Sequence, residues 1–337
     1  MNGHSGPSNG VATAGAGDST NHNEPSTSAN GPVNGYVQTP SLYQIHHEDI
    51  ITHLFQSGFQ TGNYADTLLH VRGTVYRLHA LILSRSPYLA HLMSTSPQTS
   101  NQHIIYVNLD HEPEVTDEVS LAYLYSAHSL ANIRPENARG VLAAACLLGR
   151  MDDLCNYAYE ICRQSISLDT LPIWLEFVES LSPPSSDGSS TPVVEQHQHT
   201  RTTVFGPYAQ RLRDDVFNFL IVTLPNLVNF GGQATPTTPL PEGASQHADA
   251  GRETLLQVFA RVPFELFKAA VESPTFHFAS THSRFKFAKD AIEIRKQGIA
   301  RGQGAEETVV LAFGGGPSGV LVTRKLRRRQ LWKVGNP

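Results

Sequence analysis

His79 is the residue whose type and surroundings most directly suggest chemistry. It lies in the largely apolar stretch 74–93, and Ser84 and Ser86 follow it closely. A histidine near a serine could serve as a general base for a nucleophile, or it could bind a metal together with two further ligands. No Gly-x-Ser-x-Gly elbow surrounds the serines, however. We therefore predict a structural role, in which the ring nitrogens of His79 hydrogen-bond to neighbouring backbone.

The three cysteines, Cys146, Cys155 and Cys162, contain no Cys-x-x-Cys pair. Zinc sites usually combine such closely spaced thiolates with further ligands. Cys155 and Cys162 are seven residues apart, which places them on one face of a predicted helix, as expected for small core residues. The His-x-His of residues 197–199 lies in a predicted linker. We therefore expect no metal, no other cofactor and no disulfide bond.

The glycines of residues 314–319 spell Gly-x-Gly-x-x-Gly after a β-rich run, which is the spacing of a dinucleotide-binding loop. Such a loop must open a helix, and an acidic residue should follow about 20 positions later. Here the β-rich run 320–324 follows the glycines instead. The segment therefore predicts a β-hairpin, and a nucleotide-binding enzyme is the least favoured of the functions considered.

Charge is unevenly distributed along the 337 residues, whose net charge is −5. From residue 284 onward, twelve Lys and Arg oppose four Asp and Glu, so the preceding part carries −13. An acidic body disfavours nucleic acid as the main partner. The basic segment 324–333 could be a nuclear import signal, a nucleic-acid contact or a solvated tail. Its first five basic residues are Arg324, Lys325, Arg327, Arg328 and Arg329.

No segment is predicted to cross a membrane, because the longest apolar stretch, 216–230, is interrupted by Asn and Pro residues. The first residues show neither a signal-peptide nor a myristoylation pattern. We therefore expect a soluble protein that is cytoplasmic and/or nuclear. We expect neither membrane binding nor a small-molecule substrate.

Composition divides the chain into successive segments. Residues 1–41 have too little apolar surface to offset the entropy of folding, so we predict a disordered tail. The further predicted segments are an α+β domain over 42–166, a helical extension over 167–181, a linker over 182–203, a mostly helical C-terminal region over 204–306, and a β-hairpin with a basic tail over 307–337.

The α+β domain alternates between helical and strand periods. An amphipathic helix that ends at Gly58 is predicted first, followed by two strands that flank the turn 72–74. A helical period follows His79, and a third β-rich run covers 103–110. Further helices close the domain.

The order and the residues of these elements resemble a BTB/POZ domain. In that family, a hairpin with an Asp near its start leads to a His, then to a Leu, serines and an aromatic residue. A Tyr-Leu-Tyr helix and a closing helix pair follow. The matching residues are Asp66, His79, Leu83, Ser84, Ser86, Tyr88, Tyr123 and Tyr125. The helices beyond the domain resemble those of many filamentous-fungal BTB/POZ proteins.

This resemblance implies a three-stranded sheet packed with a helical cluster. It also implies a non-catalytic protein–protein interaction module that dimerises or docks onto a partner. Many members are substrate adaptors of cullin-RING ubiquitin ligases, in which the following helices extend the contact with the cullin. Other members belong to transcriptional regulators, so the alternative function is a nuclear regulator that uses the basic segment.

Ala80 departs from the family pattern. Dimeric members often carry Lys or Arg directly after the His, where it lines a charged pocket together with the Asp. Asp66 is present here, but its basic counterpart is not. In addition, residues 93–102 are polar where cullin-binding members carry a hydrophobic-x-Glu motif. A second copy and a cullin scaffold therefore both stay open as partners.

Overall fold

The computed structural model describes residues 41–96, 98–99, 102–109, 115–181, 204–228, 230, 244–299, 306–314 and 318–327. The predicted disordered tail, except Ser41, lies outside these residues, and so do the predicted linker over 182–203, the His-x-His of residues 197–199, Arg328 and Arg329. The described residues form helices and a mixed sheet, which confirms the predicted α+β class.

The sheet comprises three longer strands and one short edge strand. These are β1 (Thr67–Val71), β2 (Thr74–Leu78), β3 (Gln98–Thr99) and β4 (Gln102–Val107). Their order is β2-β1-β4-β3; β1 pairs antiparallel with β2 and parallel with β4, and β3 pairs antiparallel with β4. The predicted three-stranded sheet is therefore present, and the two-residue β3 extends one edge.

A two-residue turn sets the register of the β1–β2 hairpin. Arg72 and Gly73 have φ values of 47° and 81°, and this pair of left-handed conformations matches the twist of antiparallel strands. The turn pairs Val71 with Thr74. Leu69 and Val71 then face the core, because successive side chains of a strand point to opposite sides of the sheet.

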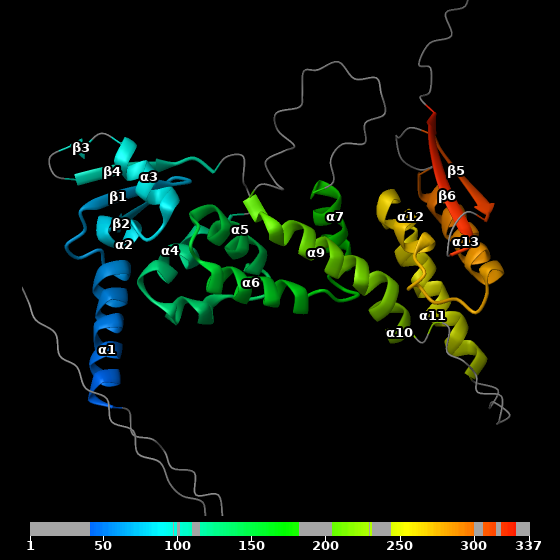
Figure 1. The fold of residues 1–337 in the computed structure, drawn as a ribbon, viewed down its shortest axis with the longest axis horizontal. Coiled ribbons are helices and arrows are strands. Elements are labelled where there is room, and N and C mark those ends of the chain that lie inside the picture. Colours follow the sequence, from blue (N-terminus) through cyan, green and yellow to red (C-terminus); the bar gives the residue numbers. More distant parts are fainter. Residues whose placement is uncertain are drawn as a thin grey trace, which may run out of the picture. The chain divides into compact units, whose positions relative to one another are not determined.

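Helices precede, connect and follow these strands. They are α1 (Leu42–His53), the π-helix η1 (Leu54–Gln60), α2 (Ala80–Leu83), α3 (Pro87–Thr95), α4 (Asp117–Tyr125), the 3-10 helix η2 (Ala127–Asn132), α5 (Ala138–Leu148) and α6 (Asp152–Gln164) (Figure 1). Helix α5 contacts α3, α4 and α6. Its run of buried alanines, 143–145, allows these neighbours to approach closely.

The predicted helix end at Gly58 is wrong. The helix continues through Gly58 to Gln60, and Gly62, with φ 63°, follows where the chain turns away. Gly58 is needed for close packing instead, because a Cβ there would lie only 3.2 Å from a ring carbon of Tyr125. Sequence alone could not distinguish these two uses of glycine.

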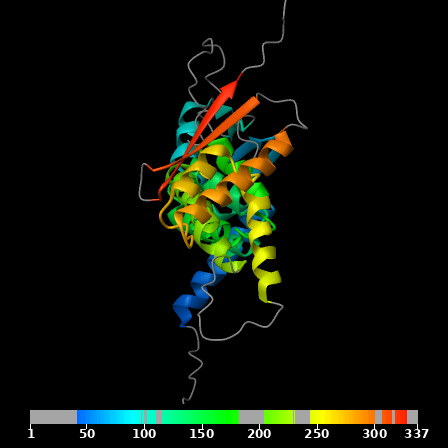
Figure 2. The ribbon, with the colours of Figure 1, turned by 90° about the vertical axis from the view of Figure 1, so that its right-hand side faces the viewer.

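The second half of the chain is mostly helical. Its elements are α7 (Leu171–Leu181), α9 (Pro207–Asn218), the π-helix η3 (Phe219–Thr223), α10 (Leu224–Leu227), α11 (Ala244–Phe259), α12 (Phe264–Glu272), α13 (Thr281–Ile299), β5 (Glu306–Phe313) and β6 (Val320–Arg327). Strands β5 and β6 pair as an antiparallel hairpin, which packs against α12 and α13 (Figures 1 and 2).

An aromatic cluster forms the core between α11 and α13. The rings of Phe259, Phe276 and Phe287 are fully buried, with centroids 5.2–5.7 Å apart. The guanidinium of Arg284 is also buried, and it donates hydrogen bonds to the carbonyls of Val271, Ser273 and Phe276. These acceptors offset the cost of removing the cation from water.

We predict that Gly251→Ala destabilises the packing of α11 on α10. A Cβ at Gly251 would lie 2.1 Å from the Val228 carbonyl oxygen, so the two helices would have to separate. We expect the unfolding free energy to fall by about 1–3 kcal/mol, despite the better helix propensity of alanine. Thermal or denaturant unfolding measures the change. Gln257→Ala is the matched control: its exposed side chain bonds to Glu253 within α11, so stability should change by less than about 0.5 kcal/mol.

Candidate interaction surface

The His79 side chain joins three segments of the first domain. Its Nε2 lies 2.8 Å from the Asn63 carbonyl oxygen, and its Nδ1 lies 2.9 Å from the Tyr125 hydroxyl. Because a carbonyl can only accept, Nε2 carries the proton and Nδ1 accepts from Tyr125. The Tyr125 oxygen in turn accepts the backbone N–H of His79 at 3.0 Å. These contacts connect the end of β2, the loop before β1 and the end of α4.

The environment of Tyr125 favours this arrangement of donors. Its side chain is buried, and burial is the main reason why its pKa rises to about 12. The negative charge of Asp66 adds to the rise, whereas the bond from the His79 N–H lowers the pKa. The hydroxyl therefore keeps its proton at neutral pH and can donate it to His79.

Asp66 caps helix α2. Its Oδ1 accepts the backbone N–H of Ala80 at 2.7 Å and the Thr67 hydroxyl at 3.0 Å. Ala80 is the first residue of α2, so the carboxylate satisfies one of the free N–H groups at that helix end. Here Asp66 has a role that requires no basic partner after His79.

The serines near His79 form hydrogen bonds with backbone groups rather than with the His79 ring. Ser84 is exposed, and its hydroxyl donates to the Leu81 carbonyl at 2.7 Å. Ser86 is fully buried; it donates to the Leu148 carbonyl and accepts the Leu89 N–H as the N-cap of α3. In these contacts neither serine meets His79 as a nucleophile would meet its base.

The remaining matched residues belong to the helical core or its margin. Leu83 is fully buried, whereas Tyr88 and Tyr123 are partly buried against the core. Burial raises the pKa of both tyrosines, and the carboxylate of Asp153 adds to the effect at Tyr123. The structure thus brings His79 together with Tyr125, and Asp66 together with Ala80. Leu83, Ser84, Tyr88 and Tyr123 lie outside these two sets of contacts.

Helix α1 exposes apolar side chains. None of its residues is buried, and Ile50 exposes 45% of its surface. Leu54, the first residue of η1, exposes 38%. A helix of 12 residues is marginal in water unless an amphipathic face packs against something. Exposed apolar patches on otherwise polar surfaces commonly mark interaction sites. The face of α1 is therefore the candidate interaction surface of this domain.

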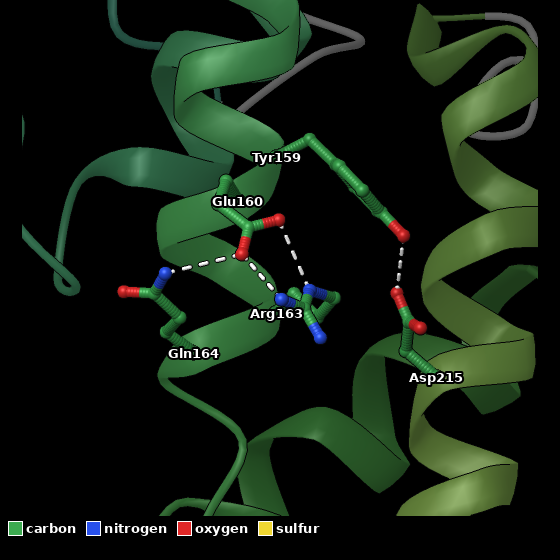
Figure 3. A network of polar contacts seen from close by, with 5 residues as sticks. All are labelled: Tyr159, Glu160, Arg163, Gln164 and Asp215. Carbon is green, nitrogen blue, oxygen red and sulfur yellow. Dashed lines mark hydrogen bonds and ion pairs between the residues drawn. The ribbon is translucent and has the colours of Figure 1, made fainter. Parts of the chain in front are cut away.

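A second set of contacts attaches α9 to α6. Figure 3 shows Tyr159 extending from α6 towards Asp215 of α9, with Glu160, Arg163 and Gln164 on the same helix as Tyr159. The Tyr159 hydroxyl donates to the carboxylate at 2.6 Å. The Glu160–Arg163 pair lies within α6 and is about half exposed, so it contributes little to this attachment.

Cation and ring contacts extend the attachment. The Arg211 guanidinium lies 4.1 Å from the ring centre of Tyr159 and 5.1 Å from that of Tyr208. Nearby, the rings of Phe177 in α7 and Phe205 meet edge to face at 5.1 Å. Such contacts add to the free energy of apolar burial. Helix α9 is thus packed on both α6 and α7.

The first residues of the basic segment belong to a strand rather than to a tail. Arg324, Lys325 and Arg327 lie in β6 and pair with residues of β5. The Arg324 guanidinium lies 4.6 Å from the ring centre of Phe264 and 3.9 Å from the Glu265 carboxylate. It is therefore engaged with α12.

The glycine motif connects β5 and β6. Gly314 and Gly319 have φ values of 102° and 70°, and Gly314 donates its N–H to the Gly319 carbonyl. A strand, and not a helix, follows the motif. The hairpin therefore lacks the helix N-terminus that binds a pyrophosphate. Among the described residues, moreover, no three His, Cys, Asp or Glu side chains are grouped as metal ligands would be.

Comparison with protein families matches residues 55–165 to the BTB/POZ domain. This part of the chain is a BTB/POZ domain. Such domains are generally non-enzymatic modules that mediate protein–protein interaction and dimerisation, so the chain carries a protein–protein interaction module. No helix within the described ranges is both long and apolar enough to span a membrane.

Relatives extend the similarity beyond the BTB/POZ domain. The chain is 28% identical to BTB/POZ domain-containing protein 2 of Schizosaccharomyces pombe, over 85% of this chain and 91% of that protein. It is also 28% identical to human Germ cell-less protein-like 2, over 121 residues. That alignment covers 35% of this chain but only 22% of the human protein. The alignment with the yeast protein, over 297 residues, therefore extends well beyond the matched residues 55–165.

Sequence reasoning missed the contacts that attach α9. Tyr159 and Asp215 are 56 positions apart, and nothing in the residues around either one indicates the partner. The only signal was that Tyr159 lies four positions after Cys155 and three before Cys162, which is the spacing of one helix face. The capping role of Asp66 was missed as well, because it depends on the approach of two segments 14 residues apart.

We predict that Tyr125→Phe destabilises the BTB/POZ domain by about 1–3 kcal/mol, because the backbone N–H and Nδ1 of His79 both lose their partner. Chemical denaturation of the full chain measures the loss. Tyr123→Phe, on the same helix, should have a smaller effect. Equal losses in the two variants would contradict the importance of the Tyr125 hydroxyl.

We further predict that Tyr159→Phe loosens α9 while the BTB/POZ domain stays folded. The substitution removes the donor to Asp215, a charge-assisted bond whose net contribution is about 1–3 kcal/mol. Amide hydrogen exchange should accelerate in α9 and not in the sheet. Tyr157→Phe, at a position that is 45% exposed, is the control and should leave the exchange of α9 unchanged.

Proposed function

We propose that this chain is a non-catalytic adaptor that brings two proteins together. The BTB/POZ domain binds one of them, either a cullin scaffold or a second copy of the chain. The C-terminal helical region binds the other. The observation that carries the proposal is the exposure of Ile50 in α1 and of Leu54 at the start of η1, although a folded protein gains free energy by burying such side chains.

The packing of α9 supports the adaptor arrangement. A substrate adaptor must hold its two binding regions in a defined relation, because a freely moving substrate would rarely meet the ligase. Helix α9 contacts α6 through the Arg211 stack and the Tyr159–Asp215 bond, and Phe205, just before α9, packs on Phe177 of α7. The helices that follow the BTB/POZ domain are therefore attached to it by more than the covalent linker.

Different features support a cullin and a second copy of the chain as the partner of the BTB/POZ domain. The resemblance implies that helices after the domain extend the contact with a cullin, and α7 and α9 follow the domain in this chain. Self-association is supported by the exposed face of α1. Because Ala80 supplies no charge and Asp66 already caps α2, a dimer of this chain would depend on apolar contacts rather than on a charged pocket.

We predict that Ile50→Asp with Leu54→Asp weakens binding by the BTB/POZ domain about tenfold or more, because a charge would be buried without a partner. Light scattering of the purified full chain measures self-association. Recovery of a purified cullin on the immobilised chain measures scaffold binding. The wild-type chain should show at least one of the two, and the double variant should lose it.

Leu227→Asp is the matched control, since Leu227 is 64% exposed on α10, outside the BTB/POZ domain. It should behave as the wild type does. If the wild-type chain stayed monomeric and retained no cullin, the adaptor proposal would be contradicted. If the Leu227→Asp chain lost self-association or cullin binding to the same extent, α1 would not be the surface involved.

The location of the protein belongs to the same proposal. A cullin adaptor can act in the cytoplasm, in the nucleus or in both, and we propose this range for the chain. A regulator confined to the nucleus is the weaker alternative. It depends on the basic segment, whose Arg324 is engaged with Phe264 and Glu265 and whose Arg328 and Arg329 lie outside the described residues.

A further inference from the structure

A tight turn brings α5 and α6 together. It spans Gly149–Met151, and Gly149 and Arg150 both have positive φ, 74° and 54°. Cys146 lies three residues before Gly149, and Cys155 lies four residues after Met151. Both cysteines therefore lie within about one helical turn of this connection, one on each of two helices that contact each other.

The two sulfur atoms are in contact. Their Sγ atoms lie 3.8 Å apart, whereas a disulfide bond requires about 2 Å. Rotation about the Cα–Cβ bonds together with a small shift of the helix ends would close this gap. Cys162, seven residues beyond Cys155 on α6, is almost fully buried, with 1% of its surface exposed. It serves as an internal reference for a core cysteine.

The surroundings make the two thiols unequal. Cys146 is partly exposed, whereas Cys155 is buried. The hydrogen bond between them lowers the pKa of Cys146, and the same bond together with burial raises the pKa of Cys155. Since the thiolate is the reactive form, Cys146 is the thiol that an oxidant in solution would meet first.

We propose that Cys146 and Cys155 form a reversible disulfide when the chain encounters a peroxide. The Cys146 thiolate attacks one peroxide oxygen, the O–O bond breaks, and after protonation water leaves; Cys146 is then a sulfenic acid. The Cys155 sulfur attacks this sulfur, an S–S bond forms, and the second water leaves with the thiol proton. The two thiols lose two electrons, and the peroxide is reduced to two waters. A dithiol reverses the change by exchange.

The disulfide would change the start of the C-terminal region. In the thiol form, Cys146 donates a hydrogen bond to the Phe205 carbonyl, with sulfur and oxygen 3.6 Å apart. A disulfide has no S–H and loses this bond. Because the Phe205 ring packs on Phe177 of α7, oxidation would loosen the residues that lead into α9.

Tryptic mapping of the full chain tests the proposal, because cleavage after Arg139, Arg150 and Arg163 separates the two cysteines. Cys146 then lies in peptide 140–150, and Cys155 lies in peptide 151–163 together with Cys162. The chain is treated with hydrogen peroxide, free thiols are blocked, and the digest is analysed by mass spectrometry before and after reduction. We expect a linked pair of these two peptides that reduction separates.

Two variants identify the sulfur that is linked. Cys155→Ser should abolish the linked pair, and Cys162→Ser should retain it. The proposal is overturned if the oxidised wild-type chain yields no linked pair, if the link joins two chains, or if Cys162→Ser removes it. If the Cys155→Ser chain failed to fold, the wild-type and Cys162→Ser chains would still test whether the disulfide forms.

Discussion

The buried hydroxyl of Tyr125 is the point on which the BTB/POZ domain depends. It accepts the N–H of His79 and donates to the His79 ring, whose other nitrogen bonds to Asn63. A single oxygen thereby holds the end of α4 against the place where the chain leaves β2. Gly58 packs against the same ring, because a Cβ there would lie 3.2 Å from a ring carbon of Tyr125 and would force a small shift of η1 or of the ring.

The attachment of the C-terminal region follows a different principle. Apolar and aromatic burial around Phe177 and Phe205 supplies most of the free energy, because burial scales with area. The polar contacts add geometric specificity, because the Tyr159–Asp215 bond and the Arg211 stack require particular distances between α6 and α9. The exposed Glu160–Arg163 pair lies within α6 and does not contribute to the position of α9.

The two sets of contacts lie in different parts of the chain: one is within the BTB/POZ domain, and the other joins it to α9. None of the residues of α1 is buried, and the proposed interaction of this part of the chain depends on them. The end of α5, close to the α5–α6 turn, contacts the residues that lead into α9. Cys146, which contacts both Cys155 and the Phe205 carbonyl, couples the chemistry of that turn to the attachment of α9.

The sequence by itself determined the fold class, the hairpin around Gly73 and the BTB/POZ resemblance, because hydrophobic periodicity and turn residues act over short distances. It also indicated that His79 belongs to a strand–helix junction. Only the tertiary structure decided which groups His79 and Asp66 bond to, and why Gly58 does not end its helix. Those outcomes depend on Tyr125 and on other residues far away in the chain, and a local pattern carries no information about contacts between distant segments.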